Sequence, residues 1–352
     1  MKKIKLALIG YGGMGKQHIK RIESNNKLEV YGVYDIDSTK DYSQLDSRIT
    51  IYSTWEEVLQ DGMVDGIIIA TPNDSHCTLA SEAMEAGKHV LCEKPVTLNA
   101  KEFEKMIEKS LSYNRVLMVN QNRRWDESFL IIKSLLSEQK LGELYYLESR
   151  VQGSRGIPND WRQKKAQGGG MLLDWGVHLI DRILLLFNNQ KVKSIYANLN
   201  YFLNHEVDDS FKITLTFTNN KRAYIEVGTA NFSELPEWYV VGSIGTGVIK
   251  DYNLNGHYIT LQGEITQDAA PVETGAGLTK TMAPRTDNSI KINELPKVES
   301  NVNEFYDNFA DVINKDSEQI VKNEEVLRVM KLIDACFESS EKDQVITFSE
   351  GL

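Results

Sequence analysis

The chain has 352 residues, more than one small domain usually holds, so we expect two domains. Its formal net charge is −10 and no long basic run offsets it, which argues against nucleic acid as the main partner. No apolar stretch approaches the roughly 20 residues of a membrane-spanning helix, so we expect no membrane partner. The three cysteines, Cys77, Cys92 and Cys336, match no disulfide or zinc spacing. We therefore expect reduced thiols, no metal site and a cytoplasmic location.

The first part of the chain alternates short apolar runs with segments of helical periodicity. Residues 4–9 and 28–34 predict strands, and residues 16–24 between them predict a helix. The same alternation continues, with helices expected at 54–60, 75–86 and 99–112 and strands at 64–70, 89–92 and 116–120. About six strands that alternate with helices are typical of a doubly wound parallel sheet. We therefore predict an α/β domain of the Rossmann type at residues 1–121.

The rhythm changes after residue 121, where strand signals follow one another closely. Strands are expected at 144–152, 194–200, 210–217, 222–229 and 238–249, and helices at 129–137, 168–187, 302–313 and 323–340. Close strands joined by short turns favour antiparallel pairing. We predict an α+β domain at residues 122–352, built on a large, mostly antiparallel open sheet. The segments 153–167 and 264–298 carry weak signals and are expected to be loops.

Residues 10–15 read Gly-Tyr-Gly-Gly-Met-Gly, which is the GxGxxG pattern of dinucleotide-binding turns. The first glycine permits the tight turn, the second lets a pyrophosphate approach the backbone, and the last allows the helix to pack closely on the strand. The pattern follows a predicted strand, opens a predicted helix, and is followed by an acidic residue at the end of the second strand. We predict a dinucleotide cofactor site formed by Gly10, Gly12, Gly13, Met14, Gly15 and Asp35.

Asp35 bears on the choice of cofactor, because a carboxylate at this position accepts hydrogen bonds from ribose hydroxyls and repels a 2′-phosphate. No arginine follows it closely in the sequence. We therefore favour NAD. NADP is the alternative, since Ser38 and Lys40 offer partners for a phosphate if Asp35 turns away.

A second turn, Thr71-Pro72-Asn73, follows the strand expected at 64–70. Ligands of open α/β sheets bind beyond the carboxyl ends of the strands. We expect this turn to contact the nicotinamide ribose or the pyrophosphate, and the alternative is a plain capping turn before the next helix. His76 is expected at the surface or at the edge of the cofactor.

Glu93-Lys94-Pro95 comes directly after the strand expected at 89–92, again at the cofactor edge of the sheet. Pro95 restricts the backbone and is a candidate for a cis peptide bond. In this position Lys94 can direct its ammonium group at a substrate oxygen beside the nicotinamide. The alternative is a surface lysine that pairs with Glu93.

The segment 168–181 places Asp174, His178 and Asp181 at spacings of four and three residues, which puts them on one face of the predicted helix. Their neighbours are mostly apolar, so these side chains are expected to be partly buried and to need partners. Together with Lys94 they favour hydride transfer to or from a carbinol carbon. The alternatives are a core histidine at position 178 and a structural role for Asp181, which would orient His178 or Arg182.

These motifs together resemble the Gfo/Idh/MocA oxidoreductases, the family of glucose–fructose oxidoreductase and inositol dehydrogenase, over essentially the whole chain. The resemblance implies a pyridine-nucleotide enzyme that oxidises or reduces a sugar, an inositol or a related polyol. It implies Lys94, Asp174 and His178 as the catalytic set, which also contacts the substrate. It further implies contacts to cofactor or substrate from Glu93, Arg124, Trp161 and Arg162.

The resemblance also implies that the C-terminal sheet packs against a partner subunit in a homodimer or homotetramer. In the expected mechanism His178 accepts the hydroxyl proton and Lys94 stabilises the developing alkoxide. One alternative is a dehydrogenase of the same fold that acts on a nucleotide sugar or an amino sugar. Its phosphate would bind basic residues, of which Arg155, Arg162, Lys164 and Lys165 are the candidates. The other alternative is a regulator that senses NAD(P) without turnover.

Overall fold

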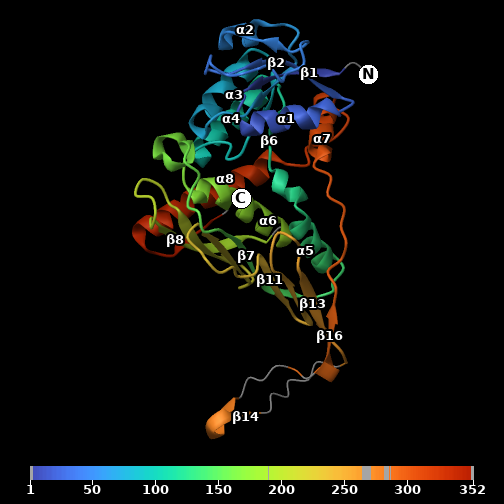
Figure 1. Cartoon of the computed structure of the whole chain (residues 1–352), viewed down its shortest axis with the longest axis vertical. Coiled ribbons are helices and arrows are strands. Elements are labelled where there is room, and N and C mark those ends of the chain that lie inside the picture. Colours follow the sequence, from blue (N-terminus) through green and yellow to red (C-terminus); the bar gives the residue numbers. More distant parts are fainter. Residues whose placement is uncertain (1–2, 189, 264–270, 281–284, 286, 350–352) are drawn as a thin grey trace.

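The computed structural model describes residues 3–349 except 189, 264–270, 281–284 and 286. The chain forms an N-terminal sheet wrapped by helices and a larger second sheet, which lie one above the other along the long axis of the molecule (Figure 1). The first sheet has six parallel strands and the second has nine, most of them antiparallel. The predicted fold class, a Rossmann sheet followed by an α+β unit, is therefore confirmed.

The N-terminal sheet has the strand order β3-β2-β1-β4-β5-β6, and all of its pairs are parallel. Side chains on both faces of the central strands are buried, because helices cover the sheet on both sides. The order reverses between β1 and β4, which is where open α/β sheets bind their ligands. The strands are β1 (Ile4–Ile9), β2 (Leu28–Tyr34), β3 (Thr50–Ile51), β4 (Gly66–Ile69), β5 (His89–Cys92) and β6 (Leu117–Val119).

Two of the helices of this sheet begin at a side-chain cap that the sequence supplies. Thr54 and Glu57 form a capping box before one helix, and the Asn99 side chain accepts a hydrogen bond from the backbone of Glu102 before another. Helix α1 begins at Gly13, three residues before the predicted start, because the last glycines of the turn already form its first turn. The helices are α1 (Gly13–Glu23), α2 (Trp55–Gln60), α3 (His76–Glu85) and α4 (Ala100–Ser112).

The second sheet has the order β16-β13-β12-β11-β7-β10-β9-β8-β17, with the pair β7–β10 parallel and the other pairs antiparallel. The segment 238–249, predicted as one strand, forms the hairpin β11–β12. The strands are β7 (Leu144–Gln152), β8 (Val192–Asn200), β9 (Ser210–Phe217), β10 (Arg222–Gly228), β11 (Trp238–Gly242), β12 (Gly245–Ile249), β13 (Gly256–Leu261), β16 (Ile290–Asn293) and β17 (Ile346–Thr347).

The segment 264–298 is not a continuous loop where it is described. It includes β16 and a separate hairpin of β14 (Val272–Thr274) and β15 (Leu278–Lys280), which projects beyond the end of the large sheet (Figure 1). Strands β3 and β13 were missed by the sequence analysis. Both lack fully buried side chains, so neither has a strong apolar pattern.

The remaining helices are α5 (Glu127–Ser137), α6 (Val177–Leu186), α7 (Asn303–Ile313) and α8 (Asn323–Lys342). Helix α6 contacts β10 and α8 contacts β8, so one face of the sheet is covered. Helices α7 and α8 also reach the N-terminal sheet, where they contact β2 and β6 respectively. The domain boundary at residue 121 stays a prediction, as does subunit assembly through the sheet. Among the described residues, no helix is both long and apolar enough to cross a membrane.

Gly15 provides a test of how closely α1 approaches the sheet. A Cβ atom at Gly15 would lie 2.1 Å from the carbonyl oxygen of Gly10, whereas a Cβ at Gly13 would meet no atom within 4 Å. We expect Gly15→Ala to lower the free energy of unfolding by about 1–3 kcal/mol, because the helix must move away from the turn. Gly13→Ala is the matched control. Denaturant unfolding without cofactor measures both, and equal stabilities would contradict the packing argument.

Candidate active site

A cavity of about 450 Å³ lies where the carboxyl end of β5 faces the start of α6. Three residues predicted as catalytic, Lys94, Asp174 and His178, line it together. They come from the two predicted domains, so the cavity exists only in the folded chain. Its wall also includes Arg123 and Trp175.

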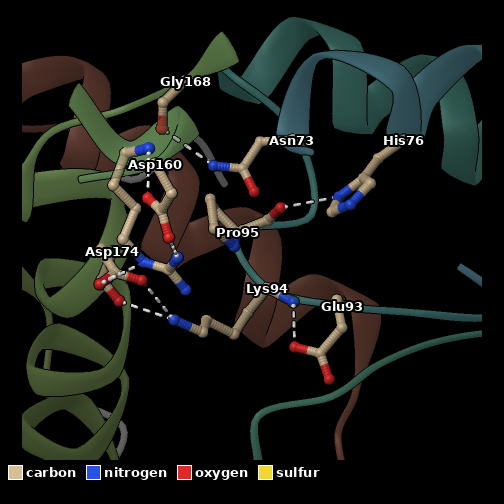
Figure 2. Close-up of polar contacts among 9 residues, drawn as sticks. Asn73, His76, Glu93, Lys94, Pro95, Asp160, Gly168 and Asp174 are labelled. Atoms are coloured by element: carbon tan, nitrogen blue, oxygen red, sulfur yellow. Dashed lines mark hydrogen bonds and ion pairs between the residues drawn. The ribbon is translucent and has the colours of Figure 1, made fainter. Parts of the chain in front are cut away.

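The Lys94 ammonium group is held by Asp174. Its Nζ atom donates to the Oδ1 atom and to the backbone oxygen of Asp174, both at 2.9 Å (Figure 2). The other carboxylate oxygen of Asp174 accepts from Arg162 Nε at 3.3 Å. Burial alone would raise the pKa of Asp174, but the charges of Lys94 and Arg162 hold it below its usual value. The alternative in which Lys94 pairs with Glu93 through its ammonium group is therefore wrong.

Asp174 lies in a π-helical turn, η5 (Leu172–Gly176), that leads into α6. The predicted helix thus begins near residue 171 and not at 168, because Gly170 has a φ of +102° that a right-handed helix excludes. A π-helical turn holds more residues than an α-helical turn. The predicted common face fails for Asp181, which does not line the cavity and pairs with Arg124.

His178 is the buried titratable group of the cavity, with 3% of its surface exposed. Its ring meets that of Trp175 edge to face, with centroids 6.2 Å apart. The Nδ1 atom is buried and has no hydrogen-bond partner. Burial, followed by the positive charges of Lys94, Arg123 and Arg182, holds the pKa of His178 well below its usual value. The imidazole is therefore neutral near pH 7 and able to accept a proton.

Of two neighbouring arginines, Arg123 faces the cavity although only Arg124 was predicted to do so. Arg123 lines the cavity, with its guanidinium 4.2 Å from the ring centroid of Trp175 and an ion pair to Asp126 at 2.8 Å. Arg124 instead binds both carboxylate oxygens of Asp181, at 2.8 and 2.6 Å. This buried pairing occupies the guanidinium of Arg124 and does not favour its contact with cofactor or substrate, which stays a prediction. Both lie in the short 3-10 helix η2 (Asn122–Trp125), whose turn geometry the sequence pattern did not reveal.

In the predicted Trp161–Arg162 pair, too, only one of the two residues lines the cavity. Arg162 lines the cavity and binds Asp174, while Trp161 is absent from the lining. The ring centroid of Trp161 lies 4.5 Å from the guanidinium of Arg162. The same guanidinium forms an ion pair with Asp160 at 2.7 Å. Trp161 thus supports Arg162, and nothing in the geometry favours its direct contact with a substrate.

The glycine turn fits the approach of a dinucleotide. Gly10 has a φ of +94°, and a Cβ there would lie 2.5 Å from the carbonyl oxygen of Ala70. By contrast, Cβ atoms at Gly12 and Gly13 would meet nothing within 4 Å, so the backbone at the start of α1 is open to a phosphate. The Asp35 carboxylate accepts from the backbone N–H of Tyr11 at 2.7 Å. It keeps further acceptor sites for ribose hydroxyls, and its preference for NAD stays a prediction.

The turn after β4 is tied to the second motif. The Asn73 side chain is buried and donates to the carbonyl oxygen of Gly168 at 2.9 Å (Figure 2). The contact of Thr71, Pro72 and Asn73 with the cofactor stays a prediction. His76 is fully buried, and its ring nitrogens lie 3.0 Å from the carbonyl oxygens of Thr71 and Pro95. Its expected place at the surface is therefore wrong, because α3 turns this side chain inward.

Glu93 is buried behind Lys94 and does not face the cavity. Its Oε1 atom accepts from His18 Nε2 at 2.9 Å and from Asn120 Nδ2 at 2.6 Å. The other ring nitrogen of His18 lies 2.9 Å from the Tyr306 hydroxyl. Burial opposes ionisation, yet His18, Asn120 and Lys94 hold the pKa of Glu93 below its usual value. The cofactor contact of Glu93 stays a prediction, which the geometry does not favour because the carboxylate is held by His18 and Asn120.

Asp208 is a buried carboxyl group that the sequence analysis missed. Its Oδ2 atom accepts from the backbone N–H of Leu172 at 2.7 Å, at the start of the π-helical turn. A Cβ at Gly170 would lie 2.3 Å from its Oδ1 atom, so that glycine leaves room for it. Within the described residues, no three histidine, cysteine, aspartate or glutamate side chains are grouped as a metal site.

From the protonation state of Asp208 we predict how the free energy of unfolding depends on pH. Burial raises the pKa of this carboxyl to about 8, so at neutral pH the folded protein holds a proton that the unfolded chain releases. The wild type therefore loses stability from this group as pH rises from about 4 to about 8. Asp208→Asn keeps an acceptor for Leu172 and does not titrate. We expect its free energy of unfolding to increase relative to wild type across that window.

Urea unfolding at about pH 5 and about pH 8 measures this difference. Asp74→Asn, an exposed site on the same chain, is the control and should show no such trend. A difference between Asp208→Asn and wild type that is the same at both pH values would contradict the assignment.

Two family models match adjacent parts of the chain. Residues 4–121 match the model described as oxidoreductase family, NAD-binding Rossmann fold, and residues 133–348 match oxidoreductase family, C-terminal alpha/beta domain. The chain is 31% identical over 342 residues to the uncharacterized oxidoreductase YdgJ of Escherichia coli (strain K12), with 96% of each chain covered. It is 28% identical over 354 residues to the scyllo-inositol 2-dehydrogenase (NADP(+)) IolW of Bacillus subtilis (strain 168), with 97% of this chain and 95% of that protein covered.

A solved structure of an NAD-binding protein from Listeria innocua has the same fold, with a TM-score of 0.92 and 47% identity. The match covers 99% of this chain and 100% of that one. The resemblance found in the glycine turn, in residues 93–95 and in residues 168–181 is thus confirmed over both sheets. The chain belongs to the Gfo/Idh/MocA oxidoreductase family and is an oxidoreductase with an NAD(P)-binding Rossmann domain.

Proposed function

We propose that the protein is an NAD(P)-dependent dehydrogenase that acts on a CH–OH group of a sugar, an inositol or a related polyol. The observation that carries the proposal is the cavity in which a buried, neutral His178 lies with the Lys94–Asp174 ion pair. A general base and a cation that can stabilise an oxyanion are the two groups this oxidation needs. The relative IolW, whose name specifies scyllo-inositol and NADP(+), supports a polyol.

The cofactor supplies the hydride acceptor for oxidation, or the hydride for reduction, when it is bound at the glycine turn and Asp35. His178 accepts the proton of the substrate hydroxyl through Nε2, because its Nδ1 atom is enclosed by protein. Lys94 donates a hydrogen bond to the same substrate oxygen and stabilises the alkoxide as its charge develops. Asp174 holds the Lys94 ammonium in position at 2.9 Å, so little side-chain reorganisation accompanies the reaction.

The two alternative functions have weaker support. Arg155, Lys164 and Lys165 are exposed and do not line the cavity, so they offer no enclosed phosphate site for a nucleotide sugar. A regulator without turnover does not need a general base, and the neutral His178 beside the Lys94–Asp174 ion pair therefore favours an enzyme. NAD is proposed as the cofactor because of Asp35, and NADP is tested beside it because of IolW.

Substitution of the two central residues tests the proposal. We expect Lys94→Met and His178→Ala to lower kcat/KM roughly 100- to 10,000-fold, since each removes a group that acts on the substrate oxygen. The measurement is the formation of reduced nicotinamide from NAD or NADP with a panel of inositols, hexoses and pentoses. Lys101→Ala, an exposed lysine of α4, is the control and should keep full activity.

Cofactor binding and thermal unfolding are measured on the same variants, so that loss of activity is separated from loss of fold. Activity that survives both substitutions would overturn the catalytic assignment. Cofactor binding without turnover of any panel compound would instead support the regulator.

The depressed pKa of His178 predicts the pH dependence of alcohol oxidation. The base must be neutral, and a folded-state pKa below 6.5 means that it becomes protonated only at lower pH. We expect kcat/KM to stay on its plateau as pH falls through about 6.5 and to decrease only below that value. Arg123→Gln removes one of the positive charges that lower this pKa, so its acidic limb should move to higher pH.

The profile is recorded for wild type, Arg123→Gln and Lys101→Ala with the best substrate of the panel. A wild-type limb centred at or above the ordinary histidine value would contradict the proposed state of His178. An unchanged limb in Arg123→Gln would contradict the electrostatic cause.

A further inference from the structure

The active-site cavity carries more positive than negative side chains, although the whole chain has a net charge of −10. Four cations line it, Arg21, Lys94, Arg123 and Arg162, against the two carboxylates of Asp126 and Asp174. A locally cationic cavity in an acidic protein favours an anionic ligand over a neutral one.

Three of these cations already have carboxylate partners. Lys94 binds Asp174 at 2.9 Å, Arg123 binds Asp126 at 2.8 Å, and Arg162 binds Asp174 at 3.3 Å. These pairs stabilise the wall of the cavity and leave little charge for a ligand.

Arg21 differs from the other three. No carboxylate of the described chain lies within 4.0 Å of its guanidinium, and its Nη1 atom is buried without a hydrogen-bond partner. The two carboxylates that line the cavity are engaged elsewhere, since Asp174 binds Lys94 and Arg162, and Asp126 binds Arg123 and Arg182. Because Arg21 lines the cavity and no carboxylate neutralises it, its guanidinium is left to a ligand that brings an acceptor.

The position of Arg21 separates this ligand from the cofactor phosphates. Met14 and Arg21 both line the cavity and lie seven residues apart on α1. Seven residues are about 20° short of two full helical turns, so both side chains lie on the same face, roughly 10 Å apart along the helix axis. The phosphates of a dinucleotide bind at the N-terminus of that helix. The end of α1 that carries Arg21 instead lies beside α7 (Figure 1). There, the Nδ1 atom of His18 lies 2.9 Å from the hydroxyl oxygen of Tyr306.

We propose that Arg21 binds an oxyanion of the substrate, so that the substrate is an acidic sugar or polyol bearing a carboxylate or a phosphate ester. The planar guanidinium matches either group through two parallel hydrogen bonds. The carbinol of the same molecule lies at Lys94 and His178. This inference rests on the proposed dehydrogenase function and adds its substrate class. Trp125, Ser300 and Val302 line the cavity as well and supply a mostly uncharged wall.

The test compares glucose, glucuronate and glucose 6-phosphate, which share a ring and differ in charge. Wild type, Arg21→Gln, Arg21→Lys and the control Lys20→Gln are assayed with NAD and with NADP. Lys20 is exposed on the same helix and does not line the cavity, so its variant makes the same charge change outside the site. A preference between glucuronate and glucose 6-phosphate identifies the oxyanion as carboxylate or phosphate.

We expect wild type and Lys20→Gln to bind and turn over an acidic compound in preference to glucose. Arg21→Gln should raise KM for that compound roughly 10- to 100-fold and leave kcat and the values for glucose nearly unchanged. Arg21→Lys should recover part of the affinity, because it restores the charge without the planar fork. Equal use of acidic and neutral compounds by wild type, or an unchanged KM in Arg21→Gln, would overturn the proposal.

Binding is also measured without turnover, from the change in tryptophan fluorescence as each compound is added to the cofactor-loaded protein. Trp125 and Trp175 line the cavity and report its occupation. Binding of an acidic compound that depends on Arg21, without turnover of any compound, would support the anion site and contradict the dehydrogenase. Turnover of neutral polyols with no anion-dependent binding would support the dehydrogenase and contradict the anion site.

Discussion

The ion pair between Lys94 and Asp174 is the interaction on which the active site depends. It joins the end of β5 in the parallel sheet to the π-helical turn that precedes α6, 80 residues later in the chain. Both groups are largely buried, so removal of either partner leaves a charge that the interior stabilises poorly. The second contact from Asn73 to Gly168 ties the neighbouring turn to the same segment. The two sheets are thereby held in one arrangement at the cavity where substrate and nicotinamide are proposed to meet.

The charges around this pair decide the chemistry of His178. The imidazole is buried and has cations near it, so its neutral form is favoured. Behind Lys94, the buried carboxylate of Glu93 accepts from His18 and Asn120 and holds the backbone that carries the lysine. Asp208 has a comparable role on the opposite side, where it binds the first N–H of the π-helical turn. Buried polar groups thus position the site from both sheets while their own side chains stay out of the cavity.

The arginines of the cavity are of two kinds, those already paired with a carboxylate and one that is proposed to bind a ligand. Arg123 and Arg162 are paired with carboxylates and stacked on Trp175 and Trp161, so their geometry is fixed before a ligand arrives. Arg21 has no such partner and offers the charge that a ligand can use. Under the proposed function, this division lets an acidic protein bind an acidic substrate, because the unpaired positive charge lies in the cavity.

The sequence by itself determined the order of elements, the Rossmann sheet, the glycine turn and the residues Lys94, Asp174 and His178, since these follow from local periodicity and from motifs at strand ends. The tertiary structure alone decided which neighbour of a motif faces the cavity. Arg124, Trp161 and Glu93 are each next to a residue that lines the cavity, yet their own side chains do not line it. Short 3-10 turns set the directions of Arg124 and Trp161, and such turns leave no repeating pattern in the sequence. Arg21 was missed for a related reason: only the folded chain brings the far end of α1 to a cavity formed by distant residues.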